Sequence, residues 1–286
     1  MTAASAAAPV SVAWGAATDV GRRRSLNEDS YLAAPPLFLV ADGMGGHQAG
    51  EVASATVIEE FARLAGRASL SIAEVQTALR AARHAVETLP DGGGAGAGTT
   101  LAGVAIADVD GEGYWLAVNL GDSRTYRLSE GVLEQISVDH SVVQELIDAG
   151  QLDAASAARD SRRNVITRAI GAGSDSEADF WMLPAETGDR VLVCSDGLPT
   201  EVDDALIDTI LREEHHPQAA AERLVREAVA AGGRDNVTVV VVDALSVQTR
   251  AGRDRFDTMP SAAAAPDTAA FDEIDGDTLP RARARA

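Results

Sequence analysis

The sequence predicts an α+β fold, a four-layer α-β-β-α sandwich with two central antiparallel sheets. Two observations lead to this prediction. The predicted elements follow one another in blocks, in the order strands, two helices, strands, two helices and one strand. Short turn signals separate successive strands, which indicates antiparallel pairing, and the helices come in pairs, which indicates layers outside a central β-sandwich.

The first strands are predicted from short apolar runs. Residues 10–17 (VSVAWGAA) predict a first strand. Residues 31–33 and 37–41 predict a hairpin that Pro35-Pro36 would turn.

Two helices are predicted to follow. Between residues 49 and 64 apolar residues recur at helical spacing. The predicted apolar face is formed by Val52, Ala55, Ile58, Phe61 and Leu64. The second helix is predicted to begin at Ser71, where Glu74 completes a capping box. Its predicted apolar face is formed by Ile72, Val75, Leu79, Val86 and Leu89.

The remaining elements follow a glycine-rich turn at 91–98. Predicted strands lie at 99–107, 113–120, 124–128 and 132–136. Asp110-Gly111 and Glu130-Gly131 are hairpin turn signals between them. A short helix at 141–149 ends at Gly150, and residues 150–180 are predicted to be irregular. The last elements are a strand at 189–195, helices at 203–214 and 217–231, and a strand at 236–243.

The composition narrows the possible functions. The formal net charge of −20 argues against nucleic acid or an anionic membrane as the partner, because both require a basic face. The sequence has no lysine, which excludes a Walker-type phosphate loop and Schiff-base chemistry. Cys194 is the single cysteine, so no internal disulfide can form. Because neither a secretion signal nor a membrane-spanning run is evident, we expect a cytoplasmic protein.

Three segments are predicted along the chain. Residues 1–9 are expected to be a short disordered N-terminus, and residues 10–244 one catalytic domain. Residues 245–286 are rich in Ala, Asp, Pro and Arg and have almost no apolar periodicity, so we expect a disordered tail. Two similar strings in the tail, FDTMP and GDTLP, make Thr258 and Thr278 candidate phosphorylation sites, although low-complexity drift is the simpler interpretation.

Four acidic strings carry the chemistry. They are RRRSLNEDS (22–30), ADGMGGH (41–47), CSDGL (194–198) and GRDNVTVVVV (233–242). Three of them place an aspartate where a strand meets a turn, namely Asp42, Asp196 and Asp235, and the first places Glu28-Asp29 just ahead of a strand. Carboxylates that converge at rigid strand ends repel one another and are tolerable only if cations neutralise them. Oxygen ligands select Mg²⁺ or Mn²⁺, so the strings predict a di-metal hydrolase.

These strings, in this order and spacing, resemble the metal-dependent Ser/Thr phosphatases of the protein phosphatase 2C family, particularly its compact bacterial members. The resemblance covers about residues 10–244. It rests further on GTTL (98–101), NLGDSRTYRL (119–128), VDHS (138–141) and NVITRAIG (164–171). It implies an α-β-β-α sandwich with the metals at one end, in agreement with the predicted order of elements.

The resemblance also implies the core metal ligands. Asp42 is similar to the ligand that bridges two metal ions, with the Gly43 carbonyl oxygen as a further ligand, and Asp196 and Asp235 would complete the site. The plainer interpretations are an Asp-Gly turn for Asp42 and strand-end caps for the other two aspartates. The implied cofactors are two Mn²⁺ or Mg²⁺ ions and a weaker third ion.

Three further acidic residues resemble more peripheral ligands. Asp29 would close the coordination shell through metal-bound water, and Glu28 would bind through water as well. A solvated acidic turn is the alternative for this pair. Asp122 resembles the ligand of the third ion, shared with Asp196; its alternative is a salt bridge to Arg124.

Two residues resemble the groups that handle the substrate. Arg24 has the spacing of the family's phosphate-binding arginine, four residues before Glu28, and a guanidinium can hold two phosphoryl oxygens. Its neighbours Arg22 and Arg23 are interpreted as solvated surface. His47 resembles the general acid that protonates the leaving oxygen, or alternatively a histidine that hydrogen-bonds a carboxylate.

Two other motifs are interpreted as scaffold. Asp139-His140-Ser141 looks like a structural turn of the family. A cysteine phosphatase requires an arginine six residues after its cysteine, whereas the sixth residue after Cys194 is Thr200, so Cys194 is expected to be buried and inert.

The resemblance therefore implies hydrolysis of phosphoserine and phosphothreonine on proteins by a metal-activated water, without a covalent intermediate. The expected partners are phosphorylated proteins, a bacterial Ser/Thr kinase and, at the tail, a phosphothreonine-binding domain; we expect a monomer. Two alternatives remain. One is an inactive phosphatase fold that serves as a binding module, and the other is a stress-response phosphatase with one dedicated regulatory partner.

Overall fold

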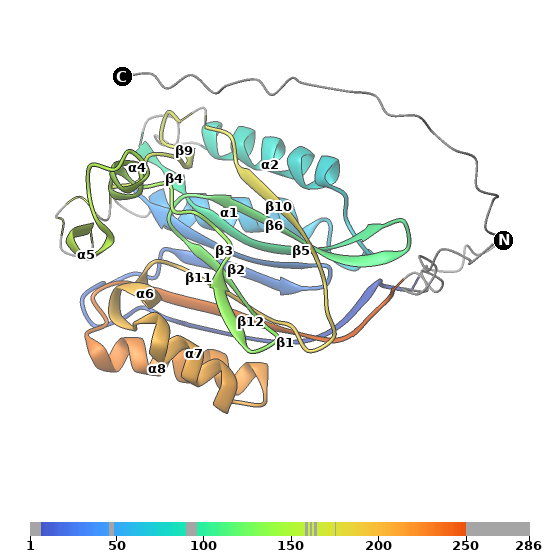
Figure 1. Ribbon diagram of the computed structural model, residues 1–286. Coiled ribbons are helices and arrows are strands. Elements are labelled where there is room, and N and C mark those ends of the chain that lie inside the picture. The colour runs from blue at the N-terminus through green and yellow to red at the C-terminus, as the bar shows by residue number, and fades with distance from the viewer. Residues whose placement is uncertain are drawn as a thin grey trace, which may run out of the picture. The chain divides into compact units, whose positions relative to one another are not determined.

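The computed structural model describes residues 7–45, 49–89, 96–157, 160, 162, 165–174 and 176–249. Within these residues two β-sheets pack face to face, and helices cover the outer face of each sheet (Figure 1). The predicted four-layer α-β-β-α sandwich is confirmed.

The smaller sheet has five strands, all paired antiparallel. Their order is β1 (Val10–Asp19), β12 (Val237–Val247), β11 (Arg190–Cys194), β7 (Arg124–Ser129) and β8 (Val132–Gln135). The outer face of this sheet is covered by α6 (Gly197–Glu201), α7 (Asp204–Glu213) and α8 (Pro217–Ala231).

The larger sheet has seven strands, also paired antiparallel. Their order is β10 (Asp179–Pro184), β6 (Glu112–Leu120), β5 (Leu101–Val109), β3 (Leu37–Met44), β4 (Gly98–Thr99) and β9 (Ile170–Gly171), with β2 (Asp29–Ala34) paired to β3. Its outer face is covered by α1 (Ala49–Ala62) and α2 (Ile72–Glu87). Two short helices, α4 (Val142–Asp148) and α5 (Ala154–Ala157), lie in the connection between β8 and β9.

Strand β12 shows why the central strands are apolar on both faces. Its residues alternate between the two sides of the sheet. Val237, Val239 and Val241 pack with the helices, whereas Val240 and Val242 pack between the sheets. A sheet that is covered on both sides requires this continuous run of valine, although its strands are antiparallel.

Several local predictions are confirmed. The Ser71 hydroxyl accepts a hydrogen bond from the Glu74 backbone N–H, and the Glu74 carboxylate accepts one from the Ser71 N–H, which completes the capping box of α2. In the two hairpin turns, Asp110 has a φ of 55° and Glu130 a φ of 49°. A glycine with positive φ follows each of them, as two-residue hairpin turns require.

The predicted apolar face of α1 is wrong in part. Val52 is 46% exposed, whereas the polar Ser54 is fully buried. The Ser54 hydroxyl donates to the Glu28 carbonyl oxygen at 2.6 Å. A side chain on Gly50 would collide with Gly43 and Glu28, so a small residue is needed where the helix meets the end of β3. The contacts that orient α1 are therefore made by small and polar residues, which an apolar pattern does not reveal.

The segment 150–180, predicted to be irregular, contains more structure than expected. It includes α5, β9 and the start of β10, which pairs with β6 from Asp179 opposite Asn119 onward. β10 is an edge strand whose residues are half-buried, so no clean alternation of apolar and polar residues marks it. The helix α6 was also not predicted, because its five residues are too few for a periodic signal.

The two ends of the described chain lie side by side. β12 continues to Val247, beyond the predicted end at residue 243, and Val247 pairs with Val10. The Gln248 N–H then donates to the Pro9 carbonyl oxygen at 2.8 Å. Residues 250–286, with Thr258 and Thr278, lie outside the described residues. No helix in the described part of the chain is long and apolar enough to span a membrane.

Candidate metal and phosphate site

The predicted aspartates come together because strand ends from both sheets meet at one end of the sandwich. Asp29 begins β2 and lies opposite Asp42 on β3. Asp196 follows β11, and Asp235 lies two residues before β12. These two strands are antiparallel neighbours, so the end of one lies beside the beginning of the other. Asp122 lies in the turn that leads from β6 of the larger sheet to β7 of the smaller one.

Between these strand ends lies a cavity of about 220 Å³, which we call the aspartate cavity. It is lined by Arg24, Glu28, Asp42, Gly43, Met44, Gly45, Thr100, Asp122, Ile166, Asp196 and Asp235. The structure thus gathers every predicted site residue around this cavity except two. Asp29 does not line the cavity but lies opposite Asp42 in the pairing of β2 with β3. His47 lies outside the described residues.

The electrostatics of the cavity are unfavourable for the carboxylates alone. Burial and then the charge of Asp29 hold the pKa of Asp42 well above its ordinary value. The pKa of Asp122 is also held high, by burial and then by the charge of Asp196. Burial raises the pKa of Asp29 to about 7, and burial together with the charge of Asp235 raises that of Asp196 to about 6. Near neutral pH the cluster therefore favours the uptake of protons or of other cations.

The donor atoms fit a hard divalent cation. They are carboxylate oxygens and backbone carbonyls, and the described residues that line the cavity include neither histidine nor cysteine. One carboxylate oxygen of Asp29, Oδ1, is buried and has no hydrogen-bond partner. Among the described residues no three His, Cys, Asp or Glu side chains are already arranged to hold a metal ion.

Gly43 allows the tight bend beside the carboxylates. Its N–H donates to the Glu28 carbonyl oxygen at 3.1 Å. A Cβ at this position would lie 2.2 Å from the Gly50 carbonyl oxygen and 2.5 Å from that of Glu28. No residue with a side chain fits there without moving backbone, so the packing of α1 against β3 by itself requires this glycine.

Arg24 lies at the rim of the aspartate cavity, and its side chain is 48% exposed. Its Nη2 donates to Asp235 Oδ2 at 2.8 Å, and its Nη1 lies 3.8 Å from a Glu28 carboxylate oxygen. The hydrogen bond with Asp235 is the main cause that raises the pKa of Arg24, so the guanidinium is always charged. A phosphate would have to compete with Asp235 for this guanidinium.

Asn236 fixes the loop that carries Arg24 and Glu28. Its side-chain oxygen accepts from the Glu28 N–H at 2.9 Å. Its amide group donates to the carbonyl oxygens of Val20 and Leu26 at 3.0 and 2.9 Å. Asn236 thereby connects the turn that carries Asp235 to the first acidic string.

Hydroxyl groups beneath the carboxylates were not predicted. The Ser195 hydroxyl donates to Asp29 Oδ2 at 2.8 Å and accepts from the Thr238 N–H at 3.0 Å. The Thr100 hydroxyl accepts from the Asp42 N–H at 3.0 Å and lies 2.7 Å from the Ser123 hydroxyl. All four residues are buried. For two of these residues the sequence contains a signal, because Ser123 and Ser195 are each next to a predicted aspartate.

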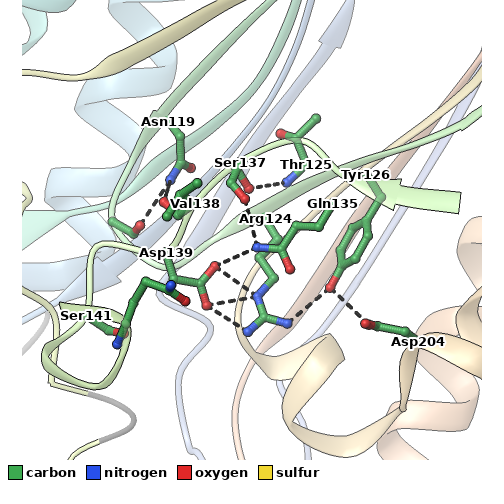
Figure 2. Close-up of polar contacts among 12 residues, drawn as sticks. Asn119, Arg124, Thr125, Tyr126, Gln135, Ser137, Val138, Asp139, Ser141 and Asp204 are labelled. Carbon is green, nitrogen blue, oxygen red and sulfur yellow. Dashed lines mark hydrogen bonds and ion pairs between the residues drawn. The ribbon is translucent and has the colours of Figure 1, made fainter. Parts of the chain in front are cut away.

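The alternative in which Asp122 pairs with Arg124 is not supported. The Arg124 guanidinium binds Asp139 instead, with Nη2 to Asp139 Oδ2 at 2.7 Å and Nε to both carboxylate oxygens at 3.0 Å (Figure 2). His140 Nδ1 accepts the Gly121 N–H at 3.1 Å, so the turn at 139–141 also holds the turn that carries Asp122. These contacts agree with a scaffold role for Asp139 and His140.

Cys194 is confirmed as a buried thiol. It lies on β11 with no exposed surface. Burial raises its pKa to about 12, which leaves the thiol protonated and unreactive at neutral pH. A cysteine nucleophile therefore does not compete with the carboxylate site as an explanation of the chemistry.

Comparisons with known proteins identify the family of the chain. A family model described as protein phosphatase 2C matches residues 21–231. The serine/threonine protein phosphatase PstP of Mycobacterium tuberculosis is 42% identical, and the match covers 80% of this chain and 44% of PstP. This chain therefore spans less than half the length of that relative. The serine/threonine phosphatase stp of Listeria monocytogenes is 35% identical, and the match covers 83% of this chain and 97% of that protein.

A solved structure gives the same result for the fold. The catalytic domain of PstP, crystallised in complex with two manganese ions, is 38% identical and has a TM-score of 0.71. The match covers 82% of this chain and 99% of that one. The family model, the relatives and the shared fold together show that the chain belongs to the protein phosphatase 2C family.

Proposed function

We propose that this protein hydrolyses phosphoserine and phosphothreonine on other proteins and depends on Mn²⁺ or Mg²⁺ to do so. The observation that carries the proposal is the convergence of five aspartates from both sheets on one end of the sandwich, with an arginine at the rim. Membership of the protein phosphatase 2C family and the named activities of PstP and stp support the same conclusion.

The residues that would hold the metal ions are those that the sequence predicts. Asp42, Asp196, Asp235 and the Gly43 carbonyl oxygen would form the core, and Asp29 and Glu28 would act through bound water. When bound, the ions supply positive charge, a water of lowered pKa and stabilisation of the phosphoryl oxygens. The two manganese ions of the PstP structure support a pair of core ions. For the weaker third ion, held by Asp122 and Asp196, the support is that both residues line the same cavity.

The charges of the site favour a phosphate only when cations are present. The four core carboxylates, counting Asp29, carry about four negative charges when ionised, and two divalent ions would balance them. A phosphate dianion can then approach without net repulsion. Hydrogen bonds from Ser195 to Asp29 and from the Asp42 backbone to Thr100 hold the carboxylates in place before substrate arrives.

Arg24 would bind the phosphoryl group. Its guanidinium offers parallel N–H donors, and its half-exposed position at the rim leaves it accessible to a protein substrate. In this assignment Arg24 exchanges its hydrogen bond with Asp235 for the phosphate, which leaves Asp235 free to bind a cation. The arginine and the carboxylate would thus separate when the site is filled.

Two further roles are part of the proposal. His47 would protonate the leaving serine or threonine oxygen. It lies outside the described residues; in the sequence it follows by three positions Met44, which lines the aspartate cavity. The physiological substrates would be proteins phosphorylated by a bacterial Ser/Thr kinase. Residues 248–286 would be dispensable for folding and catalysis, with Thr258 and Thr278 as docking points for a phosphothreonine-binding domain.

The two alternatives have less support. An inactive binding module would be expected to lack at least one of the metal carboxylates, whereas all of them are present at the cavity. A stress-response phosphatase with one dedicated partner would be expected to lack the Arg24 and Glu28 motif, whereas both residues line the cavity.

The proposal is tested by phosphate release from phosphothreonine, phosphoserine and phosphotyrosine peptides, measured with Mn²⁺ and with excess chelator. We expect turnover of the first two peptides with Mn²⁺ and none with chelator. Turnover that persists in excess chelator would contradict the metal dependence. Absence of turnover on every peptide with Mn²⁺ would favour the binding module, and turnover of a single cellular phosphoprotein only would favour the dedicated-partner alternative.

A further inference from the structure

A second, larger cavity lies beside the aspartate cavity. It has a volume of about 490 Å³, and we call it the side cavity. The two cavities share Asp122 and Asp196 in their walls. The side cavity is lined by Asp122, Arg124, Asp139, Ser141, Val143, Gln144, Ile147, Ala157, Asp196, Pro199, Thr200, Val202, Asp203 and Asp204. The proposed function uses only the two shared residues, so the rest of this cavity is unexplained.

The walls of the side cavity are held in place by hydrogen bonds. Figure 2 shows the Arg124 guanidinium between the Asp139 carboxylate and the Tyr126 hydroxyl. The Tyr126 hydroxyl in turn donates to Asp204 Oδ1 at 3.3 Å. The Asp203 carboxylate accepts the Leu206 N–H at 2.9 Å as the N-cap of α7. The carboxylates of the cavity are therefore oriented before any ligand arrives.

The side cavity is negatively charged. Arg124 is its only cation among the described residues, and this charge is matched by the ion pair with Asp139. Asp203 and Asp204 are both exposed, and within the described part of the chain neither forms an ion pair. The positive end of the α7 dipole offsets part of this charge but not two full carboxylates. If metal ions neutralise Asp122 and Asp196, the side cavity still retains about two negative charges.

Part of the wall of the side cavity is apolar. It is formed by Val143 and Ile147 of α4 and by Pro199 and Val202 around α6. A cavity lined by both apolar side chains and carboxylates suits a side chain with a long aliphatic stem and a cationic tip. Arginine and lysine have this form, because they bury their methylene groups and keep the charge at a polar edge.

The position beside the aspartate cavity indicates where such a side chain comes from. A protein substrate that places its phosphoryl group in the aspartate cavity is a continuous chain, with about 3.5 Å between successive extended residues. Residues next to the phosphorylated one must lie over adjoining surface. Because the two cavities share a wall, the side cavity is such a surface.

We propose that the side cavity is a subsite for an arginine or lysine of the substrate, close in sequence to the phosphorylated serine or threonine, and that Asp203 and Asp204 recognise its charge. This inference rests on the proposed function, because the basic residue belongs to the same phosphoprotein. It makes basic phosphorylation sites the preferred substrate class.

The test uses a short phosphothreonine peptide with alanine at every other position, together with peptides in which arginine replaces one alanine at a time. kcat/KM is measured with Mn²⁺ for the wild type and for a D203N/D204N double variant. Asparagine retains the N-cap of α7 and can still accept from Tyr126, so the helix is preserved while both charges are removed. The matched control is Asp110→Asn, at the far end of β5, about 30 Å of extended strand from the aspartate cavity.

For the wild type, arginine at one or more positions should raise kcat/KM about three- to tenfold over the alanine peptide, and less at high ionic strength. In the double variant this ratio should fall toward one, whereas Asp110→Asn should retain it. The subsite is contradicted if no arginine position is favoured, or if the double variant retains the full ratio. Circular dichroism melts of all three proteins confirm that the variants are folded.

The proposed function and the subsite fail in different ways. If the wild type releases no phosphate from any peptide with Mn²⁺, the proposed function fails. The subsite is then decided by fluorescence anisotropy with labelled forms of the same peptides. Tighter binding of an arginine peptide that is lost in the double variant supports the subsite, and equal binding of arginine and alanine peptides contradicts it.

Discussion

The aspartate cavity and the side cavity share Asp122 and Asp196, yet their other walls come from different kinds of structure. The aspartate cavity is built from the ends of paired strands, with Asp29 and Asp42 in direct register. The side cavity is built from the turn at 139–141, from α4, α5 and α6, and from the beginning of α7. The strands that lead to Asp42 and Asp196 are each paired with a neighbour on both sides, whereas the walls of the side cavity depend on side-chain contacts such as those of Arg124 (Figure 2).

The difference has a functional meaning. Chemistry that needs charges at fixed positions is assigned to the part of the fold where the backbone leaves little freedom. Recognition of the residues around the phosphate is assigned to helix ends and loops, which can change in sequence without altering the sheets. If this division is correct, changes in the aspartate cavity should act on every substrate, and changes in the side cavity should act only on the choice between substrates.

The largest expected effect comes from Asp42→Asn. Loss of this charge removes the proposed bridging ligand, so kcat/KM on any phosphothreonine peptide should fall at least about 100-fold. The loss should be equal for arginine and alanine peptides, which separates it from changes in the side cavity. Phosphate release with saturating Mn²⁺ measures the effect, and retention of more than about a tenth of the activity would argue against the role of Asp42.

Arg24→Ala should have the next largest effect. The guanidinium is proposed to bind phosphate in both the ground and the transition state, so its removal should raise KM about tenfold and change kcat less. Arg23→Ala is the matched control, because it removes the same charge from the adjacent residue. Steady-state kinetics on one phosphopeptide distinguish the two variants, and equal effects of both would show that only the local charge matters.

Thr100→Val tests whether the hydroxyls beneath the carboxylates matter. The substitution leaves the Asp42 N–H without its acceptor at a buried position. We expect activity to fall about tenfold and the free energy of unfolding to fall by about 1–2 kcal/mol. The control is Thr77→Val on α2, where the exposed hydroxyl bonds only within the helix and to Arg80. Comparable losses in both variants would remove any special role for Thr100.

The last expected effect concerns stability and not activity, and it is a pH dependence of stability without metal. The pKa of Asp29 is about 7 in the folded protein against 3.8 for an ordinary aspartate, so the folded state binds more protons than the unfolded state between about pH 4 and pH 7. Stability due to this group is therefore lost as pH rises through that window. In chelator, urea unfolding should show that the wild type loses stability relative to Asp29→Asn as pH rises over this range. A stability difference between the two proteins that does not change with pH would contradict the raised pKa of Asp29.

The sequence predicted the aspartate cavity better than the side cavity, and the reason is physical. Asp42, Asp196 and Asp235 are each adjacent to a strand that an apolar run reveals, so their convergence follows from the sheet. Asp203 and Asp204 adjoin the aspartate site only through the packing of α6 and α7, which no local pattern records. The same limit explains why the partner of Arg124 was not predicted to be Asp139, fifteen positions away.

The fold shows the same division. The central strands and the capping box at Ser71 were predicted, because burial on both faces and a reciprocal hydrogen bond leave clear local signals. The edge strand β10 and the orientation of α1 were not. They depend on pairing with β6 and on the contact of Ser54 with Glu28, which join residues distant in sequence.

The most direct test of the central claim, that divalent cations hold the converging aspartates together, is calorimetric titration of Mn²⁺ into chelator-stripped protein. The wild type should bind about two ions tightly, as two are present in the PstP catalytic domain. Asp122→Ala should retain both tight sites, because Asp122 is assigned only to a weaker third ion, whereas Asp42→Asn should lose at least one of them. A wild type that binds no Mn²⁺, or an Asp42→Asn variant that binds it as the wild type does, would contradict the account.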